Sequence, residues 1–90
     1  MNNEQENKEI LKAAIAILNY LRDHKHAKDN IEGIAQWWVG EKKSVVESAL
    51  ILLLDYEVIE EKEGYYYLSL NWQKNNSRGK FDLLVKQLKN

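Results

Sequence analysis

Residues 36–50 read QWWVGEKKSVVESAL, and this stretch decides the fold because it holds the end of one helix and the beginning of another. Gly40 can supply the left-handed conformation with which helices commonly end. Ser44 and Glu47 have the spacing of a capping box, whose side chains satisfy the free N–H groups of a first helical turn. The sequence therefore predicts a helix that ends at Gly40, a turn, and a helix that runs from Ser44 to about Tyr56.

The segments before this joint also have helical periodicity. Apolar residues recur at helical spacing from about residue 7 to residue 23, which predicts an amphipathic first helix with one buried face. Asp29 and Glu32 again have capping-box spacing, so a short second helix is expected to follow them. The apolar stripes of the second and third helices should comprise Ile31, Ile34, Ala35 and Trp38, and Val46, Ala49, Leu50 and Leu53.

From Val58 the period changes to that of strands. The stretch VIEEKEGYYYLSL predicts two short strands joined by a tight turn at residues 62–64. Tyr65 and Tyr67 share one face of the second strand, and Tyr66 takes the other. In another fold these tyrosines would serve as base-stacking platforms, but here Tyr65 and Tyr67 are expected to pack the sheet against the helices.

Composition limits the classes of function. The 90 residues predict one domain, 1–90, and 44% hydrophobic with 30% charged residues is a globular composition. The chain has no cysteine, which excludes disulfides, thiolate metal sites and cysteine nucleophiles. Its N-terminal stretch is polar and its longest apolar run, 49–54, is too short to span a bilayer, so a cytoplasmic protein is expected. The net charge is −1, with an acidic stretch at 55–63 and a basic one at 71–90.

The order helix, helix, turn, helix, hairpin resembles that of winged helix-turn-helix domains over about residues 8–70. The resemblance rests on a packing motif: Ile34, Ala35 and Trp38, then Val46, Ala49, Leu50 and Leu53, then Val58 and Ile59. It implies an α+β, mostly helical fold of three helices and a two-stranded wing. A polar loop at 71–80 and a short closing helix at 81–90 complete the expected domain. The chain departs from the family in a turn one residue longer than usual and in Glu57, where the family most often has glycine.

The resemblance also implies that the third helix enters the DNA major groove. Its predicted solvent face, however, lacks the arginine, lysine, asparagine and glutamine side chains that read base edges. That face comprises Ser44, Glu47, Ser48, Ile51 and Asp55. The predicted wing tip, at residues 60–64, is acidic and would be repelled by phosphates. A DNA-binding transcriptional regulator is therefore the alternative hypothesis, and its contacts would come from Lys42, Lys43, Ser44, Ser48, Arg78 and Lys80.

The leading hypothesis is a protein-interaction or assembly module, of which self-association is one form. The third helix carries more apolar surface than its own core requires, and Trp37 is expected to be exposed beside a buried Trp38. The residues expected to face a partner are Trp37, Val45, Ile51, Leu52 and Tyr56. The flank formed by these residues could instead be covered by the first or last helix of the same chain, and the closing helix could itself be a dimerisation element.

The sequence gives no support for catalysis, a cofactor or a bound metal. His24 and His26 lack a third identifiable metal ligand, so a polar loop is the better interpretation of that segment. The serines have no plausible base partner, and the carboxylates cluster on a charged hairpin rather than in a cleft. We therefore expect a protein that is not an enzyme, has no small-molecule substrate and does not bind a membrane.

Overall fold

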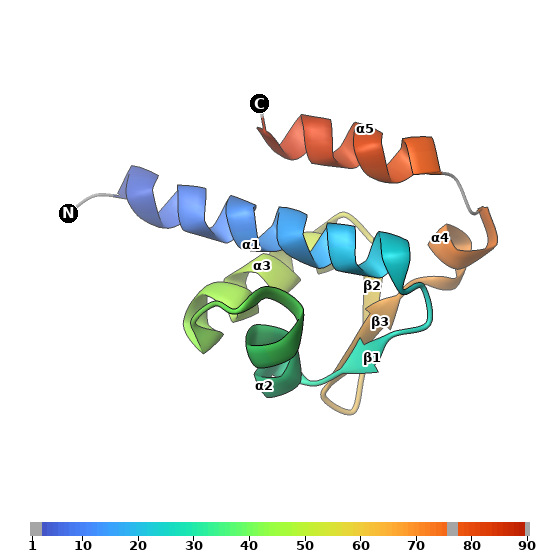
Figure 1. Ribbon diagram of the computed structural model, residues 1–90, viewed down its shortest axis with the longest axis horizontal. Coiled ribbons are helices and arrows are strands. Elements are labelled where there is room, and N and C mark those ends of the chain that lie inside the picture. Colours follow the sequence, from blue (N-terminus) through green and yellow to red (C-terminus); the bar gives the residue numbers. More distant parts are fainter. Residues whose placement is uncertain (1–2, 76–77, 90) are drawn as a thin grey trace.

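The computed structural model describes residues 3–75 and 78–89, and it shows an α+β fold that is mostly helical, with one small antiparallel sheet (Figure 1). Side chains are described for residues 7–74 and 79–89. In chain order the elements are α1 (Asn3–Asp23), β1 (Lys28–Asp29), α2 (Ile31–Gly33), the π-helical segment η1 (Ile34–Val39), α3 (Lys43–Asp55), β2 (Ile59–Lys62), β3 (Tyr65–Leu68), α4 (Leu70–Asn75) and α5 (Arg78–Lys89).

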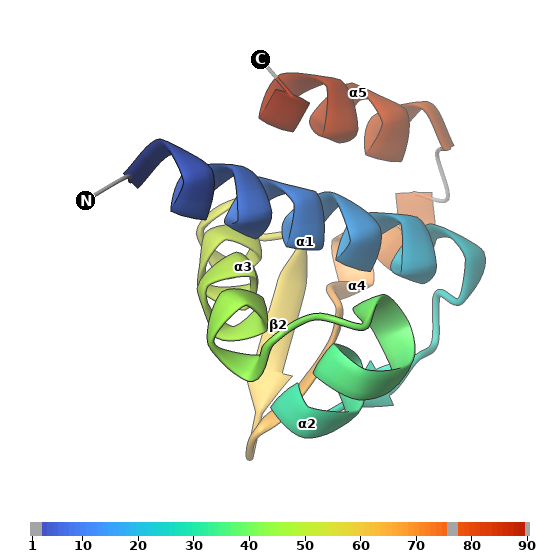
Figure 2. The ribbon, with the colours of Figure 1, turned by 60° about the vertical axis from the view of Figure 1, so that its left-hand side comes forward.

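Helix α1 is the centre of the helical layer. It packs against α3 and η1 on one side and against α5 on the other, as Figure 2 shows. Its apolar stripe is buried as the periodicity predicts, and Ala14, Ile17 and Leu18 have no exposed surface. The closing helix α5 packs within the same chain, because Phe81 and Leu88 are buried in the common core.

The second helix begins and ends through local hydrogen bonds. Asn30 caps it, its Oδ1 accepting from the Gly33 N–H at 2.9 Å, so the expected capping role of Asp29 is wrong. Asp29 belongs to β1, and its carboxylate accepts from the Asn30 N–H instead. The π-helical segment η1 continues this helix to Gly40, whose φ of 64° confirms the predicted left-handed helix end.

The N-cap of helix α3 lies two residues before the Ser44 that the capping box predicts. The helix begins at Lys43, and the residue before it, Lys42, makes no side-chain capping hydrogen bond. Ser44 therefore lies inside the first turn, where its side chain is exposed, and the predicted capping box is wrong. At the other end, Glu57 has a φ of 60°, the conformation that glycine favours.

The sheet has the strand order β1-β3-β2, and β1 is a third strand that the sequence did not predict. The predicted hairpin is confirmed: Glu63 and Gly64 both have positive φ in a two-residue turn. Register sets Leu68 against Ile59, and both are buried, so Tyr66 shares their inward face. Tyr65 and Tyr67 therefore lie on the outer face, and the expectation that they pack on the helices is wrong.

Residues 70–75 form the helix α4 rather than the polar loop that was expected. Ser69 precedes this helix, and its Oγ accepts a hydrogen bond from the Trp72 backbone N–H at 3.5 Å. The Trp72 ring meets Phe81 of α5 edge-on, with centroids 5.0 Å apart. The contact explains why a polar-looking stretch is ordered: its one large aromatic residue packs against the closing helix. No helix in the described part of the chain has the length and apolarity that crossing a bilayer requires.

Candidate functional site

An apolar groove lies between the N-terminal half of α1 and the outward side of α3. We call it the α1–α3 groove, and it has a volume of about 390 Å³. Its lining residues are Asn7, Ile10, Leu11, Ser48, Ile51, Leu52 and Asp55. A smaller hollow of about 140 Å³ continues it along α3 and shares Ile10 and Ser48 with it. Most of the lining side chains are aliphatic, so the groove can bind an apolar surface.

Two of the predicted partner-facing residues meet in this groove. Ile51 is 56% exposed, although it is a large aliphatic residue in the middle of α3. Leu52 lies beside it, half-buried against the core. Val45 is only 7% exposed because it packs in the core of its own chain, so the prediction that it faces a partner is wrong. Tyr56, at the end of α3, is exposed but does not line the groove.

The adjacent tryptophans diverge as expected. The Trp38 ring stacks on the Tyr20 ring of α1, with centroids 4.6 Å apart and planes 13° apart, and it packs against the core. Trp37 is 73% exposed on η1. Pi-helical turns are frequent at functional sites, and in this one the indole of Trp37 is exposed to solvent. Trp37 is not among the residues that line the groove, so it forms a separate exposed feature.

Four of the predicted nucleic-acid contacts lie at the start of α3, and the other two lie on α5. Lys42 is exposed, but Lys43 donates to the Glu32 carboxylate at 2.8 Å, and this hydrogen bond lowers the pKa of Glu32 and raises the pKa of Lys43. Ser44 is exposed and Ser48 lines the groove. Lys80, on α5, lies over the Trp72 ring, 4.6 Å from its centroid, and α5 packs on the side of α1 away from α3 (Figure 2). The side chain of Arg78 lies outside the described residues.

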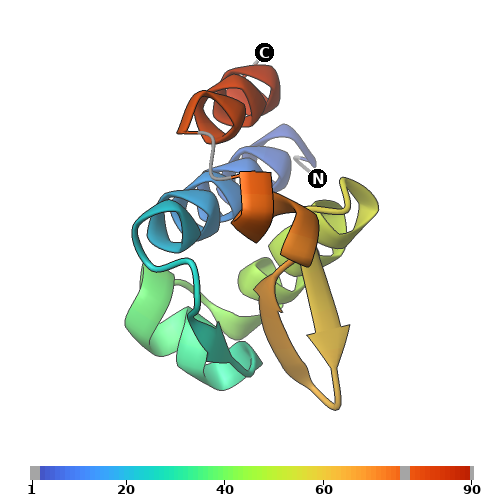
Figure 3. The same ribbon diagram turned by 90° about the vertical axis from the view of Figure 1, so that its right-hand side faces the viewer.

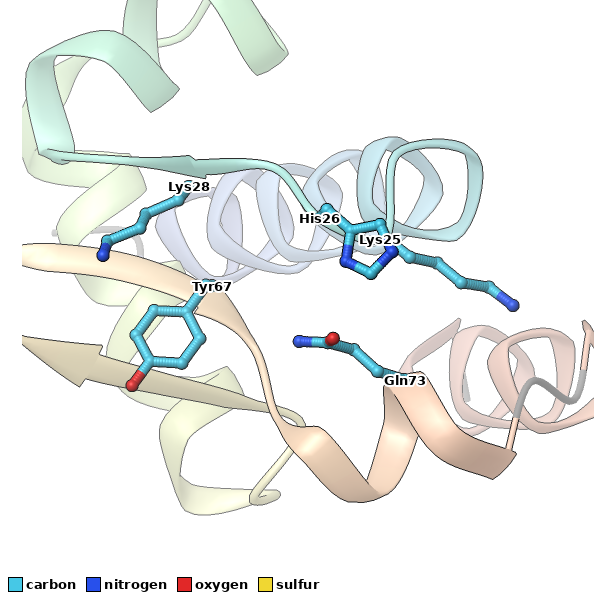
Figure 4. A pocket seen from close by; sticks show the side chains of 5 residues that line it. All are labelled: Lys25, His26, Lys28, Tyr67 and Gln73. Atoms are coloured by element: carbon cyan, nitrogen blue, oxygen red, sulfur yellow. The ribbon is translucent and has the colours of Figure 1, made fainter.

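A second surface was missed by the sequence reasoning: the outer face of the sheet. One hollow of about 150 Å³ is lined by Lys25, His26, Lys28, Tyr67 and Gln73 (Figure 4). A neighbouring hollow of about 410 Å³ is lined by Lys28, Lys62, Glu63 and Tyr65. We call the two together the basic tyrosine face. The signal was absent from local sequence, because β1 is only two residues long and places Lys28 opposite Tyr67 by pairing.

Lys28 joins the two hollows. Its Nζ lies 5.7 Å from the centroid of the Tyr67 ring and 6.0 Å from that of Tyr65. Desolvation and the neighbouring Glu60 raise the pKa of Tyr67 above its ordinary value. Figure 4 shows the His26 ring and the Gln73 amide directed toward the space beside Tyr67, with the Lys25 and Lys28 ammonium groups on opposite sides of it.

The two histidines do not form a metal centre with other described residues. In residues 3–75 and 78–89, no group of three histidine, cysteine, aspartate or glutamate side chains could hold a metal ion. His24 instead lies against the Tyr20 ring, with centroids 4.4 Å apart. His26 lines the first hollow of the basic tyrosine face.

The chain was also compared with known proteins. No protein-family model, no curated protein and no solved structure matched it.

Proposed function

We propose that this is a non-enzymatic winged-helix protein that acts as a protein-interaction module, with the α1–α3 groove as its binding surface. The fold assignment is supported by the order of the three helical segments and the hairpin, and by the left-handed turn at Gly40. The functional proposal rests on one observation: Ile51 is 56% exposed at the centre of an apolar groove on α3. In a DNA-binding winged helix that side of the third helix would carry base-reading side chains.

The physical chemistry of the groove favours a protein surface over a nucleic acid. Full burial of one isoleucine side chain stabilises a complex by about 1.5–3 kcal/mol, and Ile51 retains more than half of its exposure for a partner to cover. Asp55 lines the same groove and Glu47 is exposed on the same helix. These carboxylates would repel phosphates but are compatible with the polar rim of a protein interface.

The partner should present an apolar helix face. A second copy of this chain offers one. Two α3 helices can pair about a two-fold axis, so that Ile51 of each copy lies at the centre of the interface. We therefore expect concentration-dependent self-association. Sedimentation equilibrium over a range from about 10 to 500 µM would measure it, a range chosen to bracket the micromolar dissociation constants of modest interfaces.

Ile51→Glu should abolish the association, since it places a charge at the centre of the interface. Leu83→Glu is the matched control, because Leu83 is equally exposed but lies on α5. Both variants should keep the circular dichroism spectrum of the parent. The proposal is wrong if the protein stays monomeric throughout and binds duplex DNA at low salt, with that binding lost in Lys42→Glu. That result would assign the fold to the DNA-binding alternative.

A further inference from the structure

We propose that the basic tyrosine face binds single-stranded nucleic acid, with bases stacked on Tyr65 and Tyr67 and phosphates held by Lys25, Lys28 and Lys62. This inference is independent of the α1–α3 groove and does not require the proposed protein-interaction function. It follows from the position of Tyr65 and Tyr67 on the outer face of the sheet, where they do not pack against the helices.

The tyrosines form a regular platform. They are two residues apart on β3, the middle strand of the sheet, so their Cα atoms are separated by about 6.6–6.8 Å along the strand. Tyr65 is 42% exposed and Tyr67 is partly exposed, although aromatic side chains are costly to leave in water. Successive bases can stack on aromatic side chains, and RNA-recognition sheets use exposed strand aromatics in this way.

Cations surround this platform without carboxylate partners in the described part of the chain. Lys25 and Lys28 come from the connection after α1 and from β1, and Lys62 comes from the end of β2. The ion pairs that the structure does show involve Arg22 and Lys43 instead. The Lys28 ammonium lies next to both rings, and Lys25 and Lys62 line the hollows on either side, so a nucleotide could supply both a phosphate for the lysines and a base for the rings.

Two acids lie on or beside the same face as the three lysines, so they reduce its formal charge to +1 without cancelling it. Glu60 lies opposite Tyr67 in the sheet, and Glu63 lines the second hollow. Glu61 shares the inward face with Tyr66, and its carboxylate accepts from the Gly64 N–H at 2.7 Å. A flexible single strand can place its phosphates near the lysines and away from these acids. A rigid duplex cannot, and its bases are already stacked inside.

The hollow beside Tyr67 can also contact the edge of a stacked base. The Gln73 Nε2 donates to the Leu68 carbonyl at 2.6 Å, which fixes the amide and leaves its oxygen free to accept. The His26 ring faces the same space (Figure 4). Hydrogen bonds to unpaired base edges are the usual source of sequence preference in single-strand recognition.

The test is fluorescence anisotropy with 5′-labelled 12-nucleotide oligo-dT and oligo-U, and with a duplex of the same length, at about 50 mM salt, where phosphate contacts are strong. We expect the single strands to bind and the duplex to bind more weakly. Tyr65→Ala and Tyr67→Ala should each weaken binding by about 5- to 150-fold, and Tyr67→Phe should retain it because stacking needs only the ring. Lys28→Gln should weaken binding and reduce the slope of log affinity against log salt by about 0.7. Lys86→Gln, on α5, is the matched control and should change affinity least.

A nitrogen-15 heteronuclear titration of the unsubstituted protein keeps the test independent of variant folding. Its largest shifts should fall on the amides of β1, β3 and the 24–28 segment. The proposal is overturned if neither oligonucleotide changes the anisotropy, or if the shifts map to α3. It is also overturned if the two alanine variants, folded by circular dichroism, bind as the parent does, or if inorganic polyphosphate binds as tightly as the oligonucleotides.

Discussion

Replacing Glu57 by glycine should make the protein more stable. Glu57 follows α3 with a φ of 60°, a left-handed conformation that its side chain disfavours. The chain holds it there through two hydrogen bonds that close the helix: the Glu57 N–H donates to the Leu54 carbonyl at 2.9 Å, and the Val58 N–H donates to the Leu53 carbonyl at 3.2 Å. This is the Schellman pattern, in which the left-handed residue is usually glycine.

The magnitude follows from two opposing effects. A non-glycine residue in this conformation costs about 1–2 kcal/mol, which glycine removes. Glycine also gains freedom in the unfolded chain, which costs about 0.5–1 kcal/mol. Glu57 is exposed and makes no ion pair with another described residue, so its side chain loses little. The free energy of unfolding should therefore rise by about 0.5–1 kcal/mol.

Urea denaturation followed by circular dichroism measures this change. The midpoint should rise by several tenths of a molar while the slope stays constant, since the same surface is exposed on unfolding. Glu47→Gly is the matched control, because Glu47 is exposed within α3 and a glycine there should cost about 1 kcal/mol. A lower or unchanged midpoint for Glu57→Gly, beside the expected fall for Glu47→Gly, would refute the argument from backbone strain.

Three further changes test other parts of the fold. Phe81→Ala should lower the free energy of unfolding in urea by about 3–5 kcal/mol, because Phe81 is 2% exposed, whereas Leu83→Ala on the outer side of α5 should change it by less than about 0.5 kcal/mol. Gly40→Ala should lower the same quantity by about 1 kcal/mol, because φ is 64° there although no atom lies within 4 Å of an added Cβ. Burial and nearby glutamates raise the pKa of Tyr66, so the unfolded chain loses the phenol proton at a lower pH than the folded chain. The free energy of unfolding should therefore fall as pH rises above about 10, the ordinary tyrosine pKa. Urea titrations at several pH values should show a smaller fall for Tyr66→Phe.

The parts of the fold that depend on local pattern could be predicted from the sequence. The helical periodicity of α1, α3 and α5 and the two-residue hairpin turn are properties of neighbouring residues. Strand β1 was missed because its two residues are held only by pairing with β3, where Lys28 lies opposite Tyr67. The prediction that Tyr65 and Tyr67 face the helices was wrong for a related reason. Alternation shows that Tyr65 and Tyr67 share a face, but the buried pair Ile59 and Leu68 decides which face is inward.

The candidate surfaces were predictable to a smaller extent. Exposure of Trp37 and Ile51 follows from the helical wheel of each segment. The α1–α3 groove does not, because its other wall is Ile10 and Leu11, from a helix distant in sequence. Val45 shows the converse: its position on the wheel suggested a free flank, and tertiary packing buried it.

The two proposed surfaces adjoin different parts of α1, and this separation gives them different chemistry. An α-helix of 21 residues spans about 30 Å, so the groove beside Asn7 and Ile10 lies far from the hollow beside Lys25 and His26 (Figure 3 shows the sheet below the C-terminal end of α1). Asp55 lines the groove, which has no lysine among its described lining residues, whereas the tyrosines have Lys25, Lys28 and Lys62 near them together with Glu60 and Glu63. If both proposals hold, we expect a polyanion to bind at the sheet rather than at α3, which would leave Ile51 available for an apolar partner. The solvent side of the helix that would read DNA in a winged-helix protein carries Glu47, Ile51 and Asp55 in this chain, and none of these side chains can hold a phosphate.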